Sequence, residues 1–210
     1  MQTNVITISN TALVHASMLA AIQKFAFPNL DPEQHLTAAQ YRRHIEVFPE
    51  GQFVALNGQQ AVGSTTTLRL NFNINHPQHT MAEITDNGWL GNHDPHGEWL
   101  YGADLMVHPE FRKRGIARQL YTARYDLVRR LGLRGQVSAG MIPGYHKFAH
   151  CYTIGEYLRR VAAGDIIDPT LTAQLRVGFH YVAPIYNYLQ DTSSGNAVAL
   201  IVWENPDFGR

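Results

Sequence analysis

The fold is indicated most clearly by residues Trp99 to Leu120, which read W-L-Y-G-A-D-L-M-V-H-P-E-F-R-K-R-G-I-A-R-Q-L. The first nine residues of this stretch form an apolar run typical of a buried strand, and Pro109 marks a turn. A basic segment with one glycine then leads into an amphipathic helix that continues to Leu131 and stops before Gly132. This order of strand, turn and helix brings the first N–H groups of the helix close to the end of the strand.

The start of this helix has the properties of an anion-binding site. A helix N-terminus presents unpaired N–H groups and a partial positive charge, and Gly115 lets the backbone approach an anion closely. Two or three charge-assisted hydrogen bonds would contribute about 5 kcal/mol, which corresponds to a millimolar ligand. Further contacts could come from the backbone of residues 105–107 pairing with an extended ligand arm. Full positive charges beside the turn come from Arg112, Lys113, Arg114 and Arg118.

Two motifs resemble those of the GNAT acetyltransferase superfamily. The hexapeptide at 112–117, R-K-R-G-I-A, matches the family's acetyl-CoA signature, R/Q-x-x-G-x-G/A after a strand, and Gly178-Phe179 resembles the pair that closes its fourth helix. The resemblance implies that acetyl-CoA is the cosubstrate and that a primary amine attacks its acetyl group directly in a ternary complex. It also implies these cofactor-binding residues: Leu105, Met106, Val107, Arg112, Lys113, Arg114, Gly115, Ile116, Ala117 and Arg118.

The order of predicted elements is similar to this family from about residue 3 to residue 204. We expect a single α/β (mixed α+β) domain of the GNAT fold over residues 1–210, with a six- to seven-stranded, mostly antiparallel sheet flanked by helices. Predicted strands cover residues 5–8, 53–56, 61–70, 99–107, 136–142, 179–188 and 197–204. Predicted helices cover residues 11–27, 32–44, 112–131, 154–163 and 171–177.

Residues 143–172 form a helical insertion, longer than the family's usual passage from the fifth strand to the fourth helix. The amino-acid sequence of this segment resembles that of a bacterial GNAT subgroup that also occurs fused to carbon-nitrogen hydrolases. We therefore expect a bacterial protein. The hydrolase half is not part of the 210 residues. We predict that the inserted helix forms one wall of the acceptor pocket, because it follows the cofactor-binding strands closely.

A general base is expected near the thioester. Acetyl transfer requires a neutral nucleophile, and an alkylamine with a pKa near ~10.4 is mostly protonated at neutral pH. Asp104 is the first candidate because it interrupts the apolar strand three residues before Val107, although a structural carboxylate paired with an arginine fits the same position. Glu98, at the start of that strand, and Glu83 are the other candidates.

The proton donor for the departing thiolate is harder to assign. Many GNAT enzymes supply a tyrosine from the fourth helix, a few residues before the Gly-Phe pair, but this chain has Gln174 there. Tyr145 in the inserted segment is the candidate substitute, with Tyr152 and Tyr157 as alternatives. The missing tyrosine keeps a second interpretation open: a non-catalytic acyl-CoA-binding or regulatory module, or a partner subunit of a carbon-nitrogen hydrolase.

Composition argues against several other classes of protein. The 17 basic and 17 acidic residues cancel, so the chain has no general attraction for nucleic acid or anionic membranes. The longest strongly apolar run, residues 197–203, is far shorter than the ~20 residues of a membrane helix. Cys151 is the single cysteine, which excludes an intrachain disulfide and is compatible with the cytoplasm, where we expect the protein.

Histidines gather in the loop-like stretch between residues 71 and 97. Two H-x2-H pairs with thirteen residues between them, a spacing that could hold zinc, are formed by His76, His79, His93 and His96. The chemistry implied by the GNAT resemblance needs no metal, and we expect none. The acceptor stays open between a small-molecule amine and a peptide amine, and a homodimer formed through sheet edges is compatible with the family.

Overall fold

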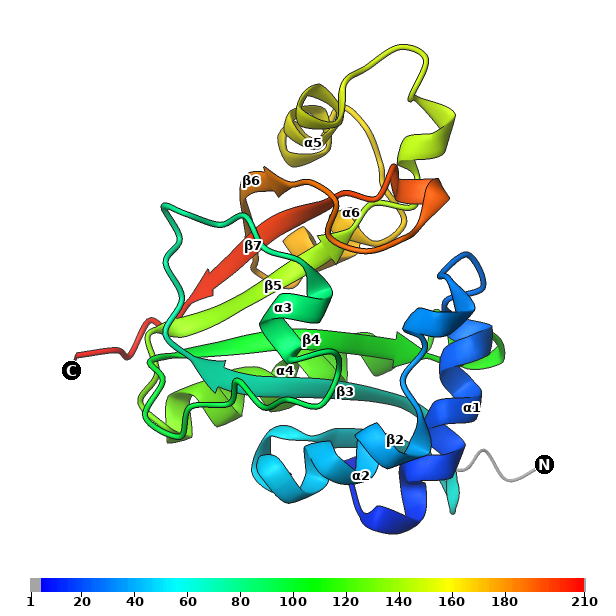
Figure 1. Cartoon of the computed structure of the whole chain (residues 1–210), viewed down its shortest axis with the longest axis vertical. Helices are drawn as coiled ribbons and strands as arrows, with labels where there is room; N and C mark the ends of the chain where they lie inside the picture. Colours follow the sequence, from blue (N-terminus) through cyan, green and yellow to red (C-terminus); the bar gives the residue numbers. More distant parts are fainter. Residues whose placement is uncertain (1–4, 210) are drawn as a thin grey trace.

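The computed structural model describes residues 5–209, which form a seven-stranded sheet (Figure 1). The spatial order of the strands is β1-β2-β3-β4-β5-β7-β6. Neighbouring strands are antiparallel except β4 and β5, which run parallel. The predicted mostly antiparallel sheet is therefore confirmed. The strands are β1 (Ile6–Asn10), β2 (Phe53–Asn57), β3 (Gln60–Leu70), β4 (Trp99–Val107), β5 (Gly135–Met141), β6 (His180–Ile185) and β7 (Val198–Glu204).

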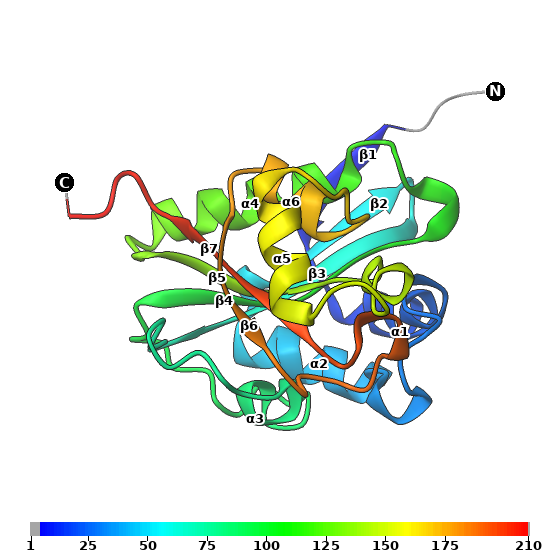
Figure 2. The ribbon, with the colours of Figure 1, turned by 90° about the horizontal axis from the view of Figure 1, so that it is seen from above.

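Helices cover both faces of the sheet (Figure 2). One face, called the α1–α3 face, packs on α1 (Ala16–Ala26), α2 (Ala38–Val47) and α3 (Met81–Thr85). The other, called the α4–α6 face, packs on α4 (Ile116–Arg130), α5 (Ile154–Ala163) and α6 (Leu171–Arg176). Within the described residues, the helices all lack the length and apolar character needed to cross a bilayer.

Three helix starts differ from the sequence-based prediction, and the helix predicted at 112–131 begins at Ile116. The predicted helix at 32–44 begins only at Ala38, and Asp31 instead caps a single 3₁₀ turn at 32–34. The reason is a stronger start signal downstream: the Thr37 side chain accepts from the Gln40 N–H and the Gln40 side chain accepts from the Thr37 N–H, which forms a capping box. The predicted helix at 11–27 likewise begins with a 3₁₀ turn and becomes α-helical at residue 16.

Strands β4 and β5 stay paired only at their beginnings. Residues 99–102 of β4 pair with residues 135–138 of β5, and the two strands then diverge, as Figure 1 shows. On its other side, β4 remains paired with β3 as far as Val107. We call the region between the diverging halves, residues 103–107 and 139–141, the fork. It leaves one edge of β4 without a ladder partner among the described residues, so that edge can pair with a ligand.

A bulge at Ala103 changes the face that the next side chains occupy. The register between β3 and β4 shifts at this residue, which has no partner on β3. In a regular strand, Tyr101 and Asp104 would point to opposite faces. Because of the bulge both point to the α1–α3 face, where Asp104 contacts Tyr41 of α2.

The inserted segment is part of the hydrophobic core. Tyr157, Leu158 and Val161 of α5 are buried in a cluster that includes Tyr121 of α4. The segment is fastened by Asp168, whose carboxylate accepts hydrogen bonds from the Tyr157 hydroxyl at 2.8 Å and from backbone N–H groups, including that of Leu171. Helix α5 therefore lies on the same face as α4. The expectation that this helix forms one wall of the acceptor pocket stays a prediction.

Candidate functional site

The turn between β4 and α4 leaves a row of backbone N–H groups free. The first hydrogen bond of α4 runs from the Gln119 N–H to the Gly115 carbonyl at 3.1 Å. No described residue accepts from the N–H groups of residues 113–118. Gly115 has a φ of 77°, and a Cβ added to it would meet no atom within 4 Å, so the space beside it is open. A diphosphate could approach these N–H groups without obstruction.

The four basic side chains at this turn divide into two pairs. Arg112 donates to the carbonyls of Val107 at 3.3 Å and Ala26 at 2.9 Å, which ties the turn to β4 and to the end of α1. Arg114 donates to a carbonyl within the turn. These two guanidinium groups shape the loop, while the exposed side chains of Lys113 and Arg118 add positive charge beside it.

On the α4–α6 face, a tyrosine and a glutamine meet beside the fork. The Gln174 amide donates to the Tyr121 hydroxyl oxygen at 3.0 Å, and both side chains are buried. A Cβ added to Gly140 of β5 would lie 2.5 Å from the Gln174 Oε1 atom, so the glutamine lies directly against the diverging strand. Among the described residues, no group accepts the Tyr121 O–H. This free phenol was missed by sequence reasoning, because its position on α4 matches no motif.

A strip of unsatisfied polar atoms continues from there toward the closed end of the fork, where β4 and β5 are still paired. Within residues 5–209, buried side-chain atoms without a partner include Gln174 Oε1, Ser138 Oγ, Gln136 Nε2 and Arg124 Nε. A Cβ on Gly102 would come within 2.4 Å of both the Arg124 guanidinium and the Ser138 hydroxyl, so these two groups pack over that glycine. Buried polar atoms of this kind are normally satisfied by ordered water or a ligand.

On the α1–α3 face, Asp104 is held at the edge of the fork. Its side chain is buried, and its carboxylate accepts from the Tyr41 hydroxyl at 3.3 Å. Burial raises the pKa of Asp104 to about 6, against the opposing effects of the Arg124 charge and the Tyr41 hydrogen bond. Asp104 is therefore ionised at neutral pH and more basic than an ordinary aspartate, as a general base requires.

His44 of α2 is a second buried titratable group on this face. Its Nε2 atom lies 2.7 Å from the Gly88 carbonyl, and its Nδ1 atom has no partner among the described residues. Burial lowers the pKa of His44 to about 4, although the bond to Gly88 opposes the shift. The imidazole is therefore neutral at pH 7.

Replacing His44 with glutamine is expected to make the protein less sensitive to acid. The pKa of His44 is about 4 in the folded protein and near 6.5 in the unfolded chain, so between these pH values protons bind mainly to the unfolded state. The free energy of unfolding therefore falls by up to about 3 kcal/mol as the pH drops from 6.5 toward 4. Glutamine keeps an N–H for Gly88 but does not titrate. Urea unfolding of both proteins between pH 7 and pH 4 measures the difference. The raised pKa of Asp104 acts in the opposite direction but is common to both proteins. A difference that does not vary with pH would contradict this prediction.

The structure does not bring the other candidate acids and bases together with Asp104. Glu98 lies at the far end of β4 and pairs with Arg134 at 2.7 Å in an exposed salt bridge. Glu83 caps its own helix, α3, through Thr80. The Tyr145 hydroxyl donates to the carbonyl of residue 152 at 3.1 Å.

The histidines of the 71–97 stretch do not gather at one site but contact different partners. His93 accepts from the Arg69 N–H at 3.1 Å and stacks on Phe48, while His79 hydrogen-bonds to Tyr101 of β4 at 2.8 Å. The side chain of His76 is exposed. In the part of the chain that the structure describes, no three His, Cys, Asp or Glu side chains are grouped so as to hold a metal ion.

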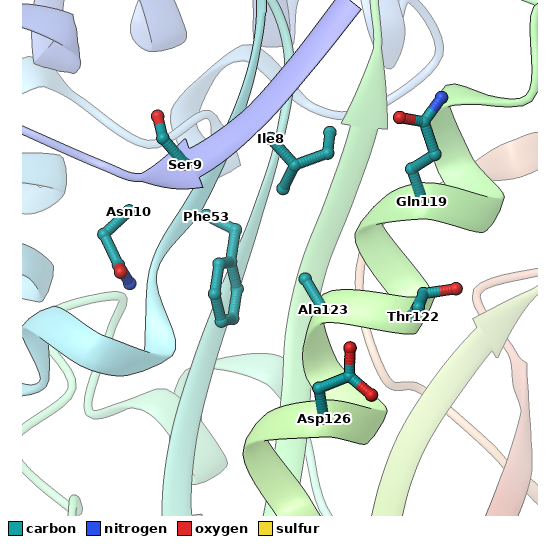
Figure 3. A pocket seen from close by; sticks show the side chains of 8 residues that line it. All are labelled: Ile8, Ser9, Asn10, Phe53, Gln119, Thr122, Ala123 and Asp126. Carbon is teal, nitrogen blue, oxygen red and sulfur yellow. The ribbon is translucent and has the colours of Figure 1, made fainter.

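A groove of about 400 Å³ lies between β1 and α4, away from the fork (Figure 3). Its α4 side is formed by residues at positions 119, 122, 123 and 126, on the side of the helix opposite Tyr121 and Arg124. Its lining contains one acidic side chain, Asp126, and no basic one, so it does not suit a diphosphate. The lining residues are Ile8, Ser9, Asn10, Phe53, Gln119, Thr122, Ala123 and Asp126.

Comparisons with known proteins agree with this architecture. A family model described as the acetyltransferase (GNAT) family matches residues 16–152. The uncharacterized N-acetyltransferase YkwB of Bacillus subtilis is 37% identical over 201 residues, which cover 95% of this chain and 89% of YkwB. The probable hydrolase YhcX of the same organism is 41% identical over 190 residues, which cover 89% of this chain but 36% of YhcX. The chain thus spans only about a third of that longer relative.

Solved structures show the same fold at low sequence identity. The loading GNATL domain of CurA from Lyngbya majuscula superposes with a TM-score of 0.83 at 15% identity, over 96% of this chain and 98% of that domain. The GphF GNAT-like decarboxylase in complex with isobutyryl-CoA gives a TM-score of 0.77 at 19% identity, over 95% and 99% of the two chains. From the family model, the relative YkwB and the shared fold, we conclude that this chain belongs to the GNAT superfamily of acetyltransferases.

Proposed function

We propose that the protein is an N-acetyltransferase that binds acetyl-CoA at the start of α4 and passes the acetyl group to a primary amine in a ternary complex. The observation that carries the proposal is the row of free N–H groups at residues 113–118, next to the unpaired edge of β4 at the fork. The diphosphate would bind these N–H groups, and the pantetheine amides would pair with residues 105–107. The isobutyryl-CoA in GphF and the name of YkwB support an acyl-CoA donor.

In this proposal Asp104 acts as the general base. The amine nitrogen attacks the thioester carbonyl carbon, the C–S bond breaks, and the proton lost by the nitrogen passes to the Asp104 carboxylate directly or through one water. A backbone N–H of β4 between Leu105 and Val107 would stabilise the oxyanion. Cys151 is exposed and has no strong nucleophile context, so a covalent acyl-enzyme is not required.

Tyr121 is the proposed proton donor to the departing thiolate. It replaces the tyrosine that is missing at position 174, because Gln174 fixes the Tyr121 hydroxyl oxygen while the O–H is left free beside the fork. Tyr121→Phe is expected to lower kcat by about 10²-fold with little change in the KM for acetyl-CoA. Steady-state kinetics with Tyr125→Phe, one turn away on α4 with its hydroxyl bonded to the Val177 carbonyl, provides the control. Equal losses in both variants would mean that the effect is structural.

The proposed function is tested by calorimetric titration with CoA and acetyl-CoA, followed by acetylation assays with small amines and peptides. Saturable CoA binding together with acetylation of at least one amine is the expected result. Binding without turnover would instead support a non-catalytic module, and co-purification with a carbon-nitrogen hydrolase would support a partner subunit. Absence of CoA binding would refute the proposal. We expect the protein to act in the cytoplasm of a bacterium, and gel filtration would test whether it forms a homodimer.

A second candidate function is decarboxylation of a carboxyacyl-CoA. The observation that favours it is Arg124, which is 1% exposed and donates to the carbonyls of Asp104 and Thr66 and to the Gln136 side chain rather than to a carboxylate. A carboxylate on the acyl chain could pair with this guanidinium at the closed end of the fork. GphF, which has the same fold, is named a decarboxylase. Release of CO2 from malonyl-CoA would support this candidate; intact malonyl-CoA alongside acetyl-CoA turnover would exclude it.

A further inference from the structure

A hydrogen-bonded chain of three side chains lies on the α1–α3 face near Asp104. The His79 Nε2 atom is 2.8 Å from the Tyr101 hydroxyl, which is 3.1 Å from the hydroxyl of Tyr188. Tyr101 and Tyr188 are buried, and the His79 ring packs edge-on against both tyrosine rings. The chain joins the 71–97 stretch, β4 and the segment between β6 and β7, which are far apart in the sequence.

The direction of the hydrogen bonds in this chain is fixed by one backbone carbonyl. The His79 Nδ1 atom lies 2.6 Å from the carbonyl of Pro77, and a carbonyl can only accept, so Nδ1 carries the proton. Nε2 is then an acceptor, and the single Tyr101 proton points to it. Tyr188 must direct its own proton either to the Tyr101 oxygen or to the Met81 sulfur, 3.1 Å away. In both arrangements the Tyr188 oxygen keeps lone pairs for an outside donor.

We propose that His79 is a positioning residue that makes the Tyr188 hydroxyl oxygen an obligate hydrogen-bond acceptor for the N–H groups of the amine substrate. A hydroxyl by itself can donate or accept, so it does not distinguish an amine from a carbonyl. Because the Tyr188 proton is directed to Tyr101 or Met81, the free side of the Tyr188 oxygen can only accept. Tyr188 therefore selects a substrate that donates a hydrogen bond. This inference rests on the proposed N-acetyl transfer. It predicts that the substrate receiving the acetyl group presents an N–H beside Asp104.

The charges around the chain agree with this role. Ala103, Ala139 and Met141 of the fork pack against the side-chain cluster that contains Tyr188. Burial raises the pKa of Tyr188 and the Asp104 charge adds to this shift, so a bound ammonium would meet negative potential there. Burial lowers the pKa of His79, while the Pro77 carbonyl and the charge of Glu83 oppose that shift. A neutral His79 therefore accepts the Tyr101 proton at pH 7. Protonated His79 would donate to Tyr101 and turn the Tyr101 proton toward Tyr188, which occupies one lone pair of the Tyr188 oxygen and frees the Tyr188 proton to point outward.

Kinetics of matched variants test the role of His79. His79→Phe cannot accept from Tyr101 and is expected to raise the KM for the amine about 10- to 100-fold while the KM for acetyl-CoA stays unchanged. His79→Gln, whose amide oxygen can accept, should restore much of the loss, and Tyr188→Phe should reproduce it. His76→Gln, an exposed change in the same stretch, serves as the control. Equal increases in both KM values, or an unchanged amine KM in Tyr188→Phe, would overturn the proposal.

The tautomer of His79 provides a test that does not depend on turnover. Long-range ¹H–¹⁵N NMR spectra of the unliganded wild-type protein should show His79 neutral and protonated at Nδ1 at pH 7. An imidazole protonated at Nε2, or at both nitrogens, would overturn the inference even if the protein acetylates amines. Absence of CoA binding would instead refute the proposed function while leaving the hydrogen-bond direction intact, so the two failures are distinguishable.

Discussion

Replacing Asp104 with asparagine is expected to lower kcat for amine acetylation by about 10²- to 10³-fold. Asparagine keeps the size of the side chain and can still accept from Tyr41, but it cannot take a proton from the attacking amine. CoA binding should be unaffected, because Asp104 lies on the α1–α3 face and the free N–H groups of residues 113–118 lie at the start of α4. Steady-state kinetics and calorimetric CoA titration of both proteins measure the two effects.

The pH profile separates this catalytic role from a structural one. Burial raises the pKa of Asp104 to about 6, so the activity of the wild-type protein should fall as the pH drops through 6 and the carboxylate becomes protonated. The Asp104→Asn variant should lack this acid limb. A variant that keeps the acid limb would contradict the assignment. A Glu98→Gln variant with the larger loss would move the role to that residue, despite its exposed pairing with Arg134.

Gly115→Val is expected to weaken CoA binding by at least 10²-fold and to leave the fold intact. The φ of 77° at this position costs a non-glycine residue about 1–2 kcal/mol, and a branched side chain would fill the open space through which an anion reaches the N–H groups. Calorimetric titration with CoA gives the affinity, and thermal unfolding gives the stability.

The other end of the same helix supplies the matched control for Gly115→Val. Gly132 also has a positive φ, 62°, and open space around its Cβ position, but it follows the C-terminus of α4. Gly132→Val should therefore lose similar stability and keep its affinity for CoA. Unchanged affinity in Gly115→Val would remove the main support for the proposed cofactor site and for the function built on it.

Most of the secondary structure and the class of fold could be predicted from the sequence alone, although α3 (Met81–Thr85) lies in the 71–97 stretch that was predicted to be a loop. Apolar runs and helical spacing predicted the strands and helices of the sheet, including α5 at the residues observed, because these patterns are local and repeat at fixed periods. The signature hexapeptide at 112–117 is equally local: a glycine with positive φ and a helix start can be recognised from adjacent residues. The fold and the family followed from these features, and the structure and the comparisons confirmed both.

Which side chains meet at the site depends on the tertiary structure. A single bulged residue, Ala103, places Asp104 on the α1–α3 face, and no periodicity in the sequence indicates that shift. His79, which the spacing suggested as a metal ligand, instead bonds to Tyr101, 22 residues away, and Gln174 bonds to Tyr121, 53 residues away. Contacts over such separations depend on how strands pair and helices pack. For that reason the candidate acids, bases and positioning residues could be assigned only once the chain was folded.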